Sequence, residues 1–538
     1  MGCRFDFFIA GWEDWPRRHT RMAGPNESSL PESRVAAASP VKSPTFYRWS
    51  WIAAIATALA LRVLFVFTTS PDSGDGPIYE ELARNWRSNG IYGLDLGRNT
   101  PTPVDIRVPG YPAFLAAVSR VFGDGPRPQM LVQAVVDVGT CLLAAMLAAW
   151  LVPPEWRKRS ALAAMWLAAL CPFLANYSAV VLTEVPATFW TAAALLALAG
   201  ACAGSEYFNW GRTAAESAAP TDTAAPLPRR RVYSFLLNRW FLGGLAVSLG
   251  TLVRPETPLL LVALALLLLW RWRRVADWGK LLRAGALAAA GFVLPLIPWT
   301  ARNAIRLHEF QPLAARYAQL PGEYVPRGFM AWTGTWLVRY RDVYLTSWKL
   351  GEQPLNISDL PASAFDSDLE RERVKSLYDE YDGHCCDFSP EWDAQFSALA
   401  RERTARHPLR TYFEVPFERS FTLWLTPRIE LSNYSGRFWP PLVQFRQDPE
   451  DFGVTALFGA IGIFYVALAL AGLWRAVACR ALLPSLQRWS IAFLVVFCVV
   501  RTAYFTHVDT PEPRYILECY PAVFALGAIF FARPKKAA

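Results

Sequence analysis

The chain has 538 residues, of which 53% are hydrophobic and only 18% are charged. Soluble proteins of this size usually carry about 25% charged residues, so the composition excludes an ordinary soluble enzyme. The formal net charge of +9 points to nucleic acid only if the basic residues gather in one domain, and here they are spread among short connections between apolar runs.

The first 48 residues are polar and rich in Pro, Ser and Arg, which predicts a disordered cytoplasmic tail. Long apolar runs follow, and a helix needs roughly 20 apolar residues to cross the hydrocarbon core. We therefore expect an all-α polytopic membrane protein with about ten spans, near 50–68, 130–151, 160–176, 185–203, 240–253, 257–271, 281–300, 452–474, 489–506 and 515–532.

The connections between these runs fall into two sets that differ in charge. Basic residues crowd one set, which includes Arg157–Arg159, Arg229–Arg231 and Arg271–Arg274. The positive-inside rule places this set and both termini in the cytoplasm. The other set then faces outward and contains residues 70–129 and 301–451. Because the positive charge reports orientation, no nucleic-acid partner is expected.

These patterns divide the chain into four parts. They are a tail (1–48), a transmembrane catalytic domain (49–300) with an outer loop (70–129), an extracytoplasmic soluble segment (301–451), and C-terminal spans with a short cytoplasmic tail (452–538). Within the outer loop, two amphipathic helices are predicted near 77–88 and 112–122. Residues 204–235 are rich in Ala, Pro and Thr and predict a flexible cytoplasmic loop.

Ionisable residues gather at the outward ends of the spans, where charge is costly unless it serves a purpose. Asp72 and Asp75 follow the first span, and Glu184 lies between the third and fourth. The later outward connections add Arg254, Glu256, Arg302, His507, Glu512 and Arg514. This convergence predicts a functional site at the outward membrane surface.

Each of these residues also has a purely structural explanation. Asp75 could cap the helix that Pro77 begins, and Asp72 could be a solvated loop residue. Glu184 could face a helix dipole, Arg254 could snorkel at the interface, His507 could pack or cap, and Glu512 could simply pair with Arg514.

Six strings carry a resemblance, and they appear in order along the chain. They are GDGPIYEELARNW (74–86), DIRVPGYPAFLAA (105–117), SAVVLTEVPATFW (178–190), LGTLVRPETPLLL (249–261), PLIPWTARNAIR (295–306) and TPEPRYILECYP (510–521). Together they resemble bacterial membrane glycosyltransferases of the GT-C fold, the group related to protein O-mannosyltransferases, lipid A aminoarabinose transferase and lipid A core galacturonosyltransferases. The resemblance implies a bundle of transmembrane helices, an outward catalytic cavity and a catalytic aspartate in the first outer loop, which matches Asp75.

The function implied is transfer of a sugar from a polyprenyl-phosphate donor to a lipid, glycan or protein acceptor, on the extracytoplasmic face of a bacterial inner membrane. Asp75 is the candidate base, and single displacement with inversion is the expected course. Arginine suits the departing phosphate through its bidentate fork. The candidate phosphate ligands are Arg254, Arg302 and Arg514.

The remaining candidates are substrate-binding or positioning residues. Tyr79 lies one helical turn from Asp75, and Arg107 could orient the loop or hold a sugar. Glu184 could bind a sugar hydroxyl or, with Asp75, a divalent cation, and metal dependence stays open. The rest of the predicted substrate-binding set is Asp72, Tyr111, Glu256, His507, Glu512 and Tyr515.

Two other functions fit an outward polar site. A transporter or flippase of lipid-linked sugars would favour symmetric halves and polar residues near mid-span, and neither pattern is evident. A non-catalytic glycan receptor would keep aromatic residues for sugar binding and tolerate loss of Asp75.

Overall fold

The computed structural model describes residues 44–69, 74–97, 100–203, 238–315, 317, 320, 323–384, 386–432 and 434–532. Residues 48–538 form one compact unit, and only the start of α2 is described in the separate unit 1–47. The predicted N-terminal tail before residue 44, the loop 204–235 and Asp72 lie outside the described residues.

Long apolar helices form the body of the compact unit. Six helices in the described ranges are long and apolar enough to cross a membrane. They are α2 (Pro44–Thr68), α5 (Pro126–Trp150), α8 (Glu184–Cys202), α12 (Trp278–Arg306), α19 (Pro449–Ala478) and α20 (Ser485–Phe505). The expected all-α, multi-pass architecture is confirmed.

The other expected spans are shorter helices. They are α6 (Arg157–Ala169), α7 (Pro172–Tyr177), α10 (Arg239–Thr251), α11 (Leu259–Arg271) and α21 (Tyr520–Ile529), the last preceded by the 3₁₀ helix η5 (Pro513–Cys519). Pro172 separates α6 from α7, because proline disfavours helix at the residue before it. A helix of 13 residues, such as α10, rises about 20 Å, which is less than the hydrocarbon thickness.

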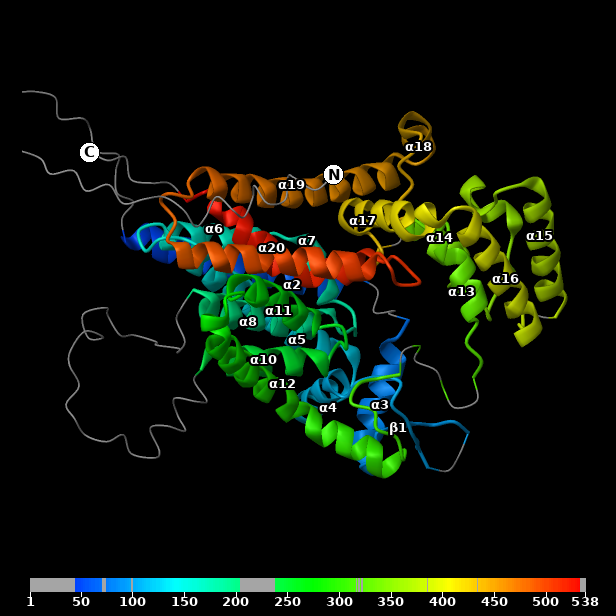
Figure 1. The fold of residues 1–538 in the computed structure, drawn as a ribbon, viewed down its shortest axis with the longest axis horizontal. Coiled ribbons are helices and arrows are strands. Elements are labelled where there is room, and N and C mark those ends of the chain that lie inside the picture. The colour runs from blue at the N-terminus through cyan, green and yellow to red at the C-terminus, as the bar shows by residue number, and fades with distance from the viewer. Residues whose placement is uncertain are drawn as a thin grey trace, which may run out of the picture. The chain divides into compact units, whose positions relative to one another are not determined.

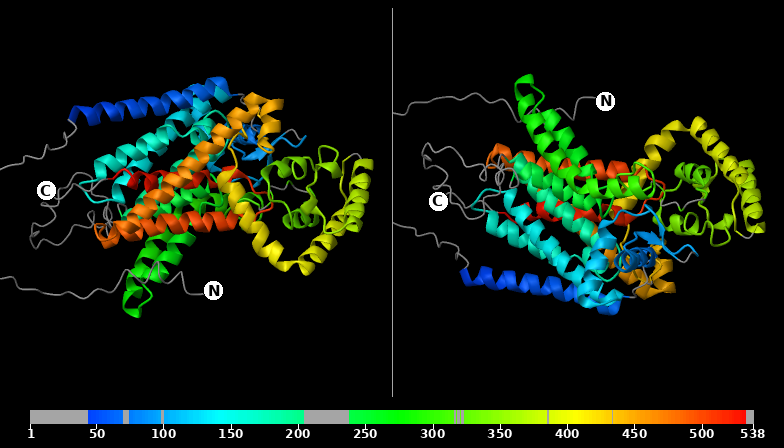
Figure 2. Two further views of the ribbon diagram at one scale, coloured as in Figure 1. Left: turned by 90° about the horizontal axis from the view of Figure 1, so that it is seen from above. Right: turned by 90° about the horizontal axis from the view of Figure 1, so that it is seen from below.

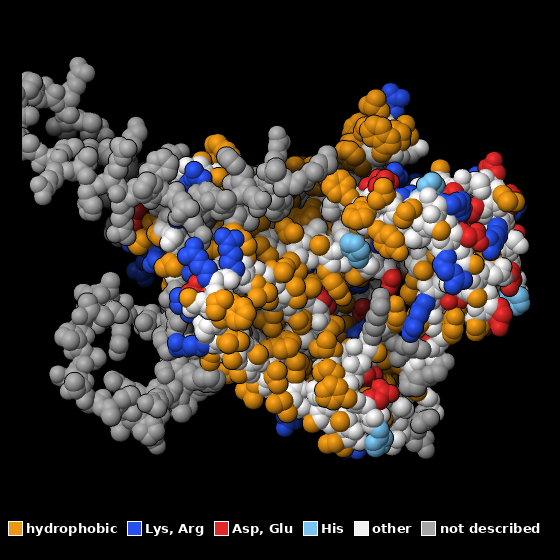
Figure 3. All heavy atoms as spheres, in the orientation of Figure 1, with side chains coloured by type: hydrophobic (Ala, Val, Ile, Leu, Met, Phe, Trp, Pro, Cys, Tyr) orange, Lys and Arg blue, Asp and Glu red, His pale blue; other side chains and the backbone are white. Residues whose placement is uncertain are grey.

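Helix α8 lies at the centre of the bundle. In its most apolar stretch 83% of the residues are buried, against 22% in α2, α12 and α19. It packs against α5, α10 and α20, while α21 packs against α5 and α19 (Figure 1). Hydrophobic side chains cover much of the visible bundle surface (Figure 3). That surface is the one expected of helices that contact lipid.

The loop after α2 contains α3 (Gly76–Asn89), β1 (Gly93–Leu94), β2 (Thr102–Pro103) and α4 (Gly110–Phe122). Its two helices match the two amphipathic helices predicted there. The strands pair antiparallel, with Gly93 opposite Pro103. Tyr92 packs edge-on against Trp299 of α12, with ring centroids 5.1 Å apart, so the loop is docked on the bundle.

Helices α13–α16 form a lobe at one end of the long helices (Figures 1 and 2). They are α13 (Arg327–Gly334), α14 (Tyr340–Leu345), α15 (Asp368–Gly383) and α16 (Pro390–Arg406). The short helices η1 (Val275–Asp277), η2 (Ile357–Asp359), η3 (Ala362–Ala364), η4 (Arg410–Glu414), α17 (Val415–Leu425) and α18 (Pro441–Gln447) complete the described elements.

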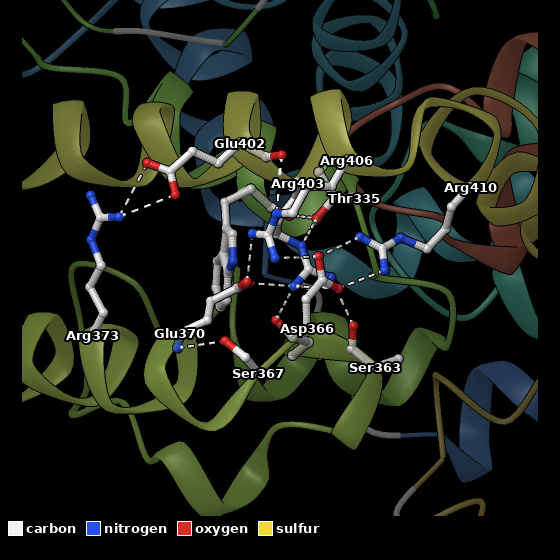
Figure 4. Close-up of polar contacts among 12 residues, drawn as sticks. Thr335, Ser363, Asp366, Ser367, Glu370, Arg373, Glu402, Arg403, Arg406 and Arg410 are labelled. Atoms are coloured by element: carbon white, nitrogen blue, oxygen red, sulfur yellow. Dashed lines mark hydrogen bonds and ion pairs between the residues drawn. The ribbon is translucent and has the colours of Figure 1, made fainter.

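The lobe has its own core, separate from that of the bundle. Trp332, Trp392 and Phe396 are buried in it, and both tryptophan rings pack against Phe396 at a tilt. Beside them, the buried Arg403 donates hydrogen bonds to the Thr335 hydroxyl (2.9 Å) and to Glu370 (Figure 4). This core consists of residues of the lobe itself, without residues of the membrane helices.

Candidate functional site

Asp75 occupies the residue before α3, but its side chain does not cap the helix. Its carboxylate instead lies 2.9 Å from Nη2 of Arg107, and 36% of the side chain is exposed. Pro77 helps α3 to begin without a capping side chain, because proline has no N–H to satisfy. The capping explanation of Asp75 is therefore wrong. The carboxylate pairs with Arg107 instead, and its exposed part can contact a ligand.

Two buried tyrosines, Tyr79 and Tyr111, pack next to Arg107. The Arg107 guanidinium lies 5.8 Å from the ring centroid of Tyr79, and Tyr79 packs edge-on against Tyr111 at 5.1 Å. The Tyr111 hydroxyl donates to Gln133 of α5 at 2.7 Å. Burial raises the pKa of Tyr79 to about 12, so this ring stays neutral. Tyr79 thus contacts the guanidinium that pairs with Asp75.

Gly110 joins the Arg107 turn to the turn that carries Arg254. Its N–H donates to the carbonyl of Leu252 at 2.5 Å, two residues before Arg254. A Cβ at this position would lie 2.4 Å from that carbonyl oxygen. Only glycine allows this approach, which explains the glycine in the RVPGYP string.

Arg254 lies within a cluster of buried charges. Its guanidinium is 2.6 Å from Glu256, 3.2 Å from Glu184 and 3.7 Å from Glu518. Arg501 of α20 also pairs with Glu518, at 2.8 Å. Since three carboxylates already surround Arg254, its charge is compensated within the protein. The geometry favours a structural role for Arg254 over phosphate binding.

Arg514 lies beside this cluster, and its side chain is more exposed than those of Arg254 and Arg501. It pairs with Glu512 at 2.6 Å and lies 3.7 Å from Glu184, and 23% of its side chain is exposed. The Tyr515 hydroxyl donates to the same Glu512 at 2.9 Å. The pairing of Glu512 with Arg514 that the sequence left open is present, and it holds the guanidinium in place.

Asp75 and Arg514 line one cavity of about 350 Å³, here called the Asp75 cavity. Its lining residues are Gly74, Asp75, Tyr177, Leu182, Tyr340, Tyr344, Trp348, Glu430, Leu431 and Arg514. They come from the loop after α2, from the end of α7, from the turn before α8, from α14 and the turn after it, from the segment after α17, and from η5. The cavity thus combines two carboxylates, a guanidinium and several aromatic rings.

A second cavity of about 350 Å³, here called the Arg302 cavity, lies between the first loop and α12. Trp86, Tyr92 and Trp299 are among its mostly apolar lining residues, with Arg302 and Arg306. Arg302 donates to the carbonyls of Tyr92 (2.5 Å) and Val104 (2.9 Å). Arg302 and Asp75 therefore line different cavities.

His507 and Glu184 do not line the Asp75 cavity. His507 is exposed at the end of α20, with Nδ1 2.9 Å from the carbonyl oxygen of Ala503. Among the described residues, no group of three or more His, Cys, Asp or Glu side chains is arranged to hold a metal ion. Glu184 and Asp75 each pair with an arginine rather than with each other.

No protein-family model and no curated protein matches the chain. Among solved structures, it is similar to the Archaeoglobus fulgidus oligosaccharyltransferase in its apo form (15% identity, TM-score 0.44), covering 90% of this chain and 50% of that one. It is also similar to ArnT from Cupriavidus metallidurans bound to undecaprenyl phosphate (14% identity, TM-score 0.39), covering 87% of this chain and 78% of that one. The chain thus spans about half the length of the oligosaccharyltransferase. At these identities and TM-scores the likenesses say nothing about activity or substrates.

The sequence analysis missed eight of the ten residues that line the Asp75 cavity, and four of them carry large aromatic or charged side chains from the segment 301–451. Glu430 follows α17, and Tyr340, Tyr344 and Trp348 belong to α14 and the turn after it. The only available signal was the abundance of Trp and Tyr in the segment 301–451. No local sequence pattern distinguishes these four from the other polar and aromatic residues of the segment 301–451.

Proposed function

We propose that this protein is a GT-C membrane glycosyltransferase that moves a sugar from a polyprenyl-phosphate donor to an acceptor hydroxyl. The observation that carries the proposal is the shared cavity of Asp75 and Arg514, at the ends of membrane helices. The order of the six strings, from GDGPIYEELARNW to TPEPRYILECYP, supports it.

The two side chains suit the two charge changes of the reaction. Asp75 takes the proton of the acceptor hydroxyl while the hydroxyl oxygen attacks the anomeric carbon. The bond from that carbon to the phosphate oxygen breaks, and the phosphate leaves with the electron pair. Arg514 neutralises the departing phosphate. One displacement inverts the anomeric centre, and no covalent sugar–enzyme intermediate is needed.

The Arg302 cavity suits the lipid part of the donor. Its lining is mostly apolar, and Arg302 and Arg306 add positive charge. Such a mostly apolar cavity fits the hydrocarbon chain of the donor, whose phosphate is assigned to Arg514. The charge distribution of the connections supports an extracytoplasmic location for both cavities, which the proposal assigns to a bacterial inner membrane.

The test is transfer by the purified full-length protein from labelled polyprenyl-phosphate sugars to lipid, glycan and peptide acceptors. Asp75→Asn should abolish transfer, and Arg514→Gln should lower it with donor binding still measurable. The matched control is Asp124→Asn, because Asp124 pairs with Arg87 in the same loop at 2.7 Å outside the cavity. Undiminished transfer by Asp75→Asn would overturn the base assignment. Movement of labelled lipid across vesicles without any transfer would favour a flippase.

A further inference from the structure

An apolar stripe, here called the α17 stripe, runs along one face of α17 and the residues just before it. Large side chains stand four residues apart on this face, and all of them are exposed, namely Leu409, Phe413, Phe417, Phe421 and Leu425. The opposite face, with Arg419 and Leu423, is buried. The ring of Phe417 is 66% exposed and packs edge-on against Phe421, with centroids 5.1 Å apart. A continuous apolar patch of this kind marks a surface that meets an apolar partner.

Helix α18 and the residues before it expose a second apolar surface, here called the α18 arm (residues 437–447). Its exposed apolar side chains are Phe438, Trp439, Leu442, Val443 and Phe445. Arg437 and Arg446 are exposed near its two ends. The arm stands out beside the beginning of α19, and hydrophobic side chains cover much of its visible face (Figures 1 and 3). With seven residues, α18 rises about 10 Å, so it cannot cross a bilayer.

Contacts with the membrane helices fix the level of both surfaces. The Trp424 indole of α17 donates to the hydroxyl of Thr502 at 3.0 Å, in the last turn of α20. The ring of Phe438 stacks on that of Phe452, in the first turn of α19, with centroids 5.3 Å apart. Both α19 and α20 are long and apolar enough to cross a membrane, and these two ends lie at the end of the bundle next to the lobe (Figure 1). The α17 stripe and the α18 arm therefore lie at the level where a bilayer meets water.

A bilayer surface accounts for the composition at this level. Aromatic side chains concentrate where membrane and water meet, and arginines there reach lipid phosphates with their long side chains. The exposed apolar surface also continues onto α19 and α20, where Leu457 and Tyr504 are exposed. Because α19 and α20 bring the bilayer to this level, lipid already contacts the neighbouring surface.

We infer that the α17 stripe and the α18 arm form an in-plane membrane anchor, which contacts the interfacial layer of phospholipids on the side of the lobe. Trp439 and Leu442 lie at the boundary between headgroups and acyl chains, while Arg437 and Arg446 bind lipid phosphates. The sequence predicts a soluble segment over 301–451, and the anchor instead assigns its last helices to the membrane surface. The inference concerns the location of these helices and does not depend on the proposed function.

The anchor also bears on the Asp75 cavity. Glu430 and Leu431 line this cavity and lie in the chain between the α17 stripe and the α18 arm. With both neighbouring segments at the membrane surface, this side of the cavity is held at the same level.

The depth of single side chains in a bilayer tests the inference. The purified full-length protein is reconstituted into phosphatidylcholine vesicles with a nitroxide on one introduced cysteine, from Leu442→Cys or Phe421→Cys. EPR then measures collision of the nitroxide with oxygen, which concentrates in lipid, and with a water-soluble nickel chelate. The same treatment of the protein without an introduced cysteine gives the background from its native thiols.

Two reference positions calibrate the depth. Leu369→Cys labels an exposed leucine of α15 in the lobe, and Ile463→Cys labels an exposed position midway along α19. The nickel chelate should reach positions 442 and 421 severalfold less than position 369, and oxygen should reach them severalfold more. Their depth should be shallower than that of position 463, about 5–10 Å into the boundary between headgroups and acyl chains.

Variants of the arm test which side chain holds it. Trp439→Ser should raise nickel access at position 442 about twofold, because the arm loses its largest anchoring ring, and Trp439→Phe should leave that access nearly unchanged. The matched control is Phe310→Ser, which removes an exposed ring after α12 and should have no effect.

Nickel access at position 442 equal to that at position 369 would place the arm in water and overturn the inference. Low access of both reagents would show that protein, such as a second copy of this chain, covers the arm, and would also overturn it. A depth equal to that of position 463 would contradict an in-plane location. None of these measurements involves transfer, so their outcome is separate from that of the proposed function.

Discussion

The guanidinium of Arg107 lies 2.9 Å from the carboxylate of Asp75, although 32 positions separate the two residues in the first loop. The pair is partly exposed, so its contribution to stability is small. In the proposed function the pair matters for orientation, because a base must point at the proton that it removes. Several measurable consequences come from this relationship and its neighbours.

Arg107→Gln should lower the kcat of transfer by about 100-fold, because a misplaced base loses most of its effect, while KM changes little. Arg107→Lys should recover part of the loss, since it keeps the charge but not the fork. Steady-state kinetics with a saturating donor measure both. Arg87→Gln is the control, since Arg87 pairs with Asp124 in the same loop. An Arg107→Gln variant as active as the control would contradict the positioning role.

Arg254 and Arg514 should behave differently on substitution. Arg254→Gln leaves Glu184 and Glu256 without their shared partner and should cost about 3–5 kcal/mol of stability. Arg514→Gln should lower kcat with a smaller loss of stability, because Arg514 is partly exposed in the cavity. Apparent Tm in detergent, measured beside kcat, separates the two. Equal losses of Tm would argue against the distinction.

Gly110→Ala should destabilise the protein by about 1–3 kcal/mol, since the added Cβ would overlap the Leu252 carbonyl. It should also lower transfer, because the Arg107 turn would shift from the Arg254 turn. The matched control is Gly285→Ala in α12, where nothing lies within 4 Å of the new Cβ. That control should be neutral or slightly stabilising, so an equal effect of both substitutions would refute the close-approach argument.

Within the bundle, Arg62 of α2 and Asp137 of α5 form a buried ion pair at 2.8 Å. Asp137→Ala should cost about 3–5 kcal/mol, because it leaves a buried guanidinium without its counter-charge. The double variant Arg62→Met with Asp137→Leu should recover most of this loss. Thermal melts of the three proteins in one detergent test the prediction. A double variant less stable than the single one would show that the pair itself is required.

The Glu430 carboxyl should make stability depend on pH in an unusual direction. Because burial raises its pKa, the folded chain keeps a proton that the unfolded chain has released, and folding stability falls as pH rises through this interval. Glu430→Gln removes that loss. The variant should therefore melt higher than the wild type near pH 8, with the difference shrinking toward about pH 4.

Glu450→Gln provides the comparison, because Glu450 accepts a similar tyrosine hydroxyl bond at the surface. The pH dependence of its melting temperature should match that of the wild type. A Glu430→Gln variant that melts at the wild-type temperature at both pH values would show that burial of the charged Glu430 carboxylate does not lower folding stability.

The sequence by itself determined the membrane architecture and the two amphipathic helices of the first loop, and it singled out Asp75 as a candidate base. These features depend on contiguous residues, since apolar length, helical period and a proline helix start are all local properties. The strings around Asp75, Arg107 and Gly110 also lie close together along the chain, so their association could be anticipated.

Only the tertiary structure decided which residues share the cavity with Asp75. It places Arg514 there, assigns Arg302 to the other cavity, and surrounds Arg254 with carboxylates. It also brings Glu430 to Tyr177 across 253 positions of sequence. The physical reason is that a cavity is formed by the packing of distant elements, and no local pattern records which side chains that packing turns toward the same space.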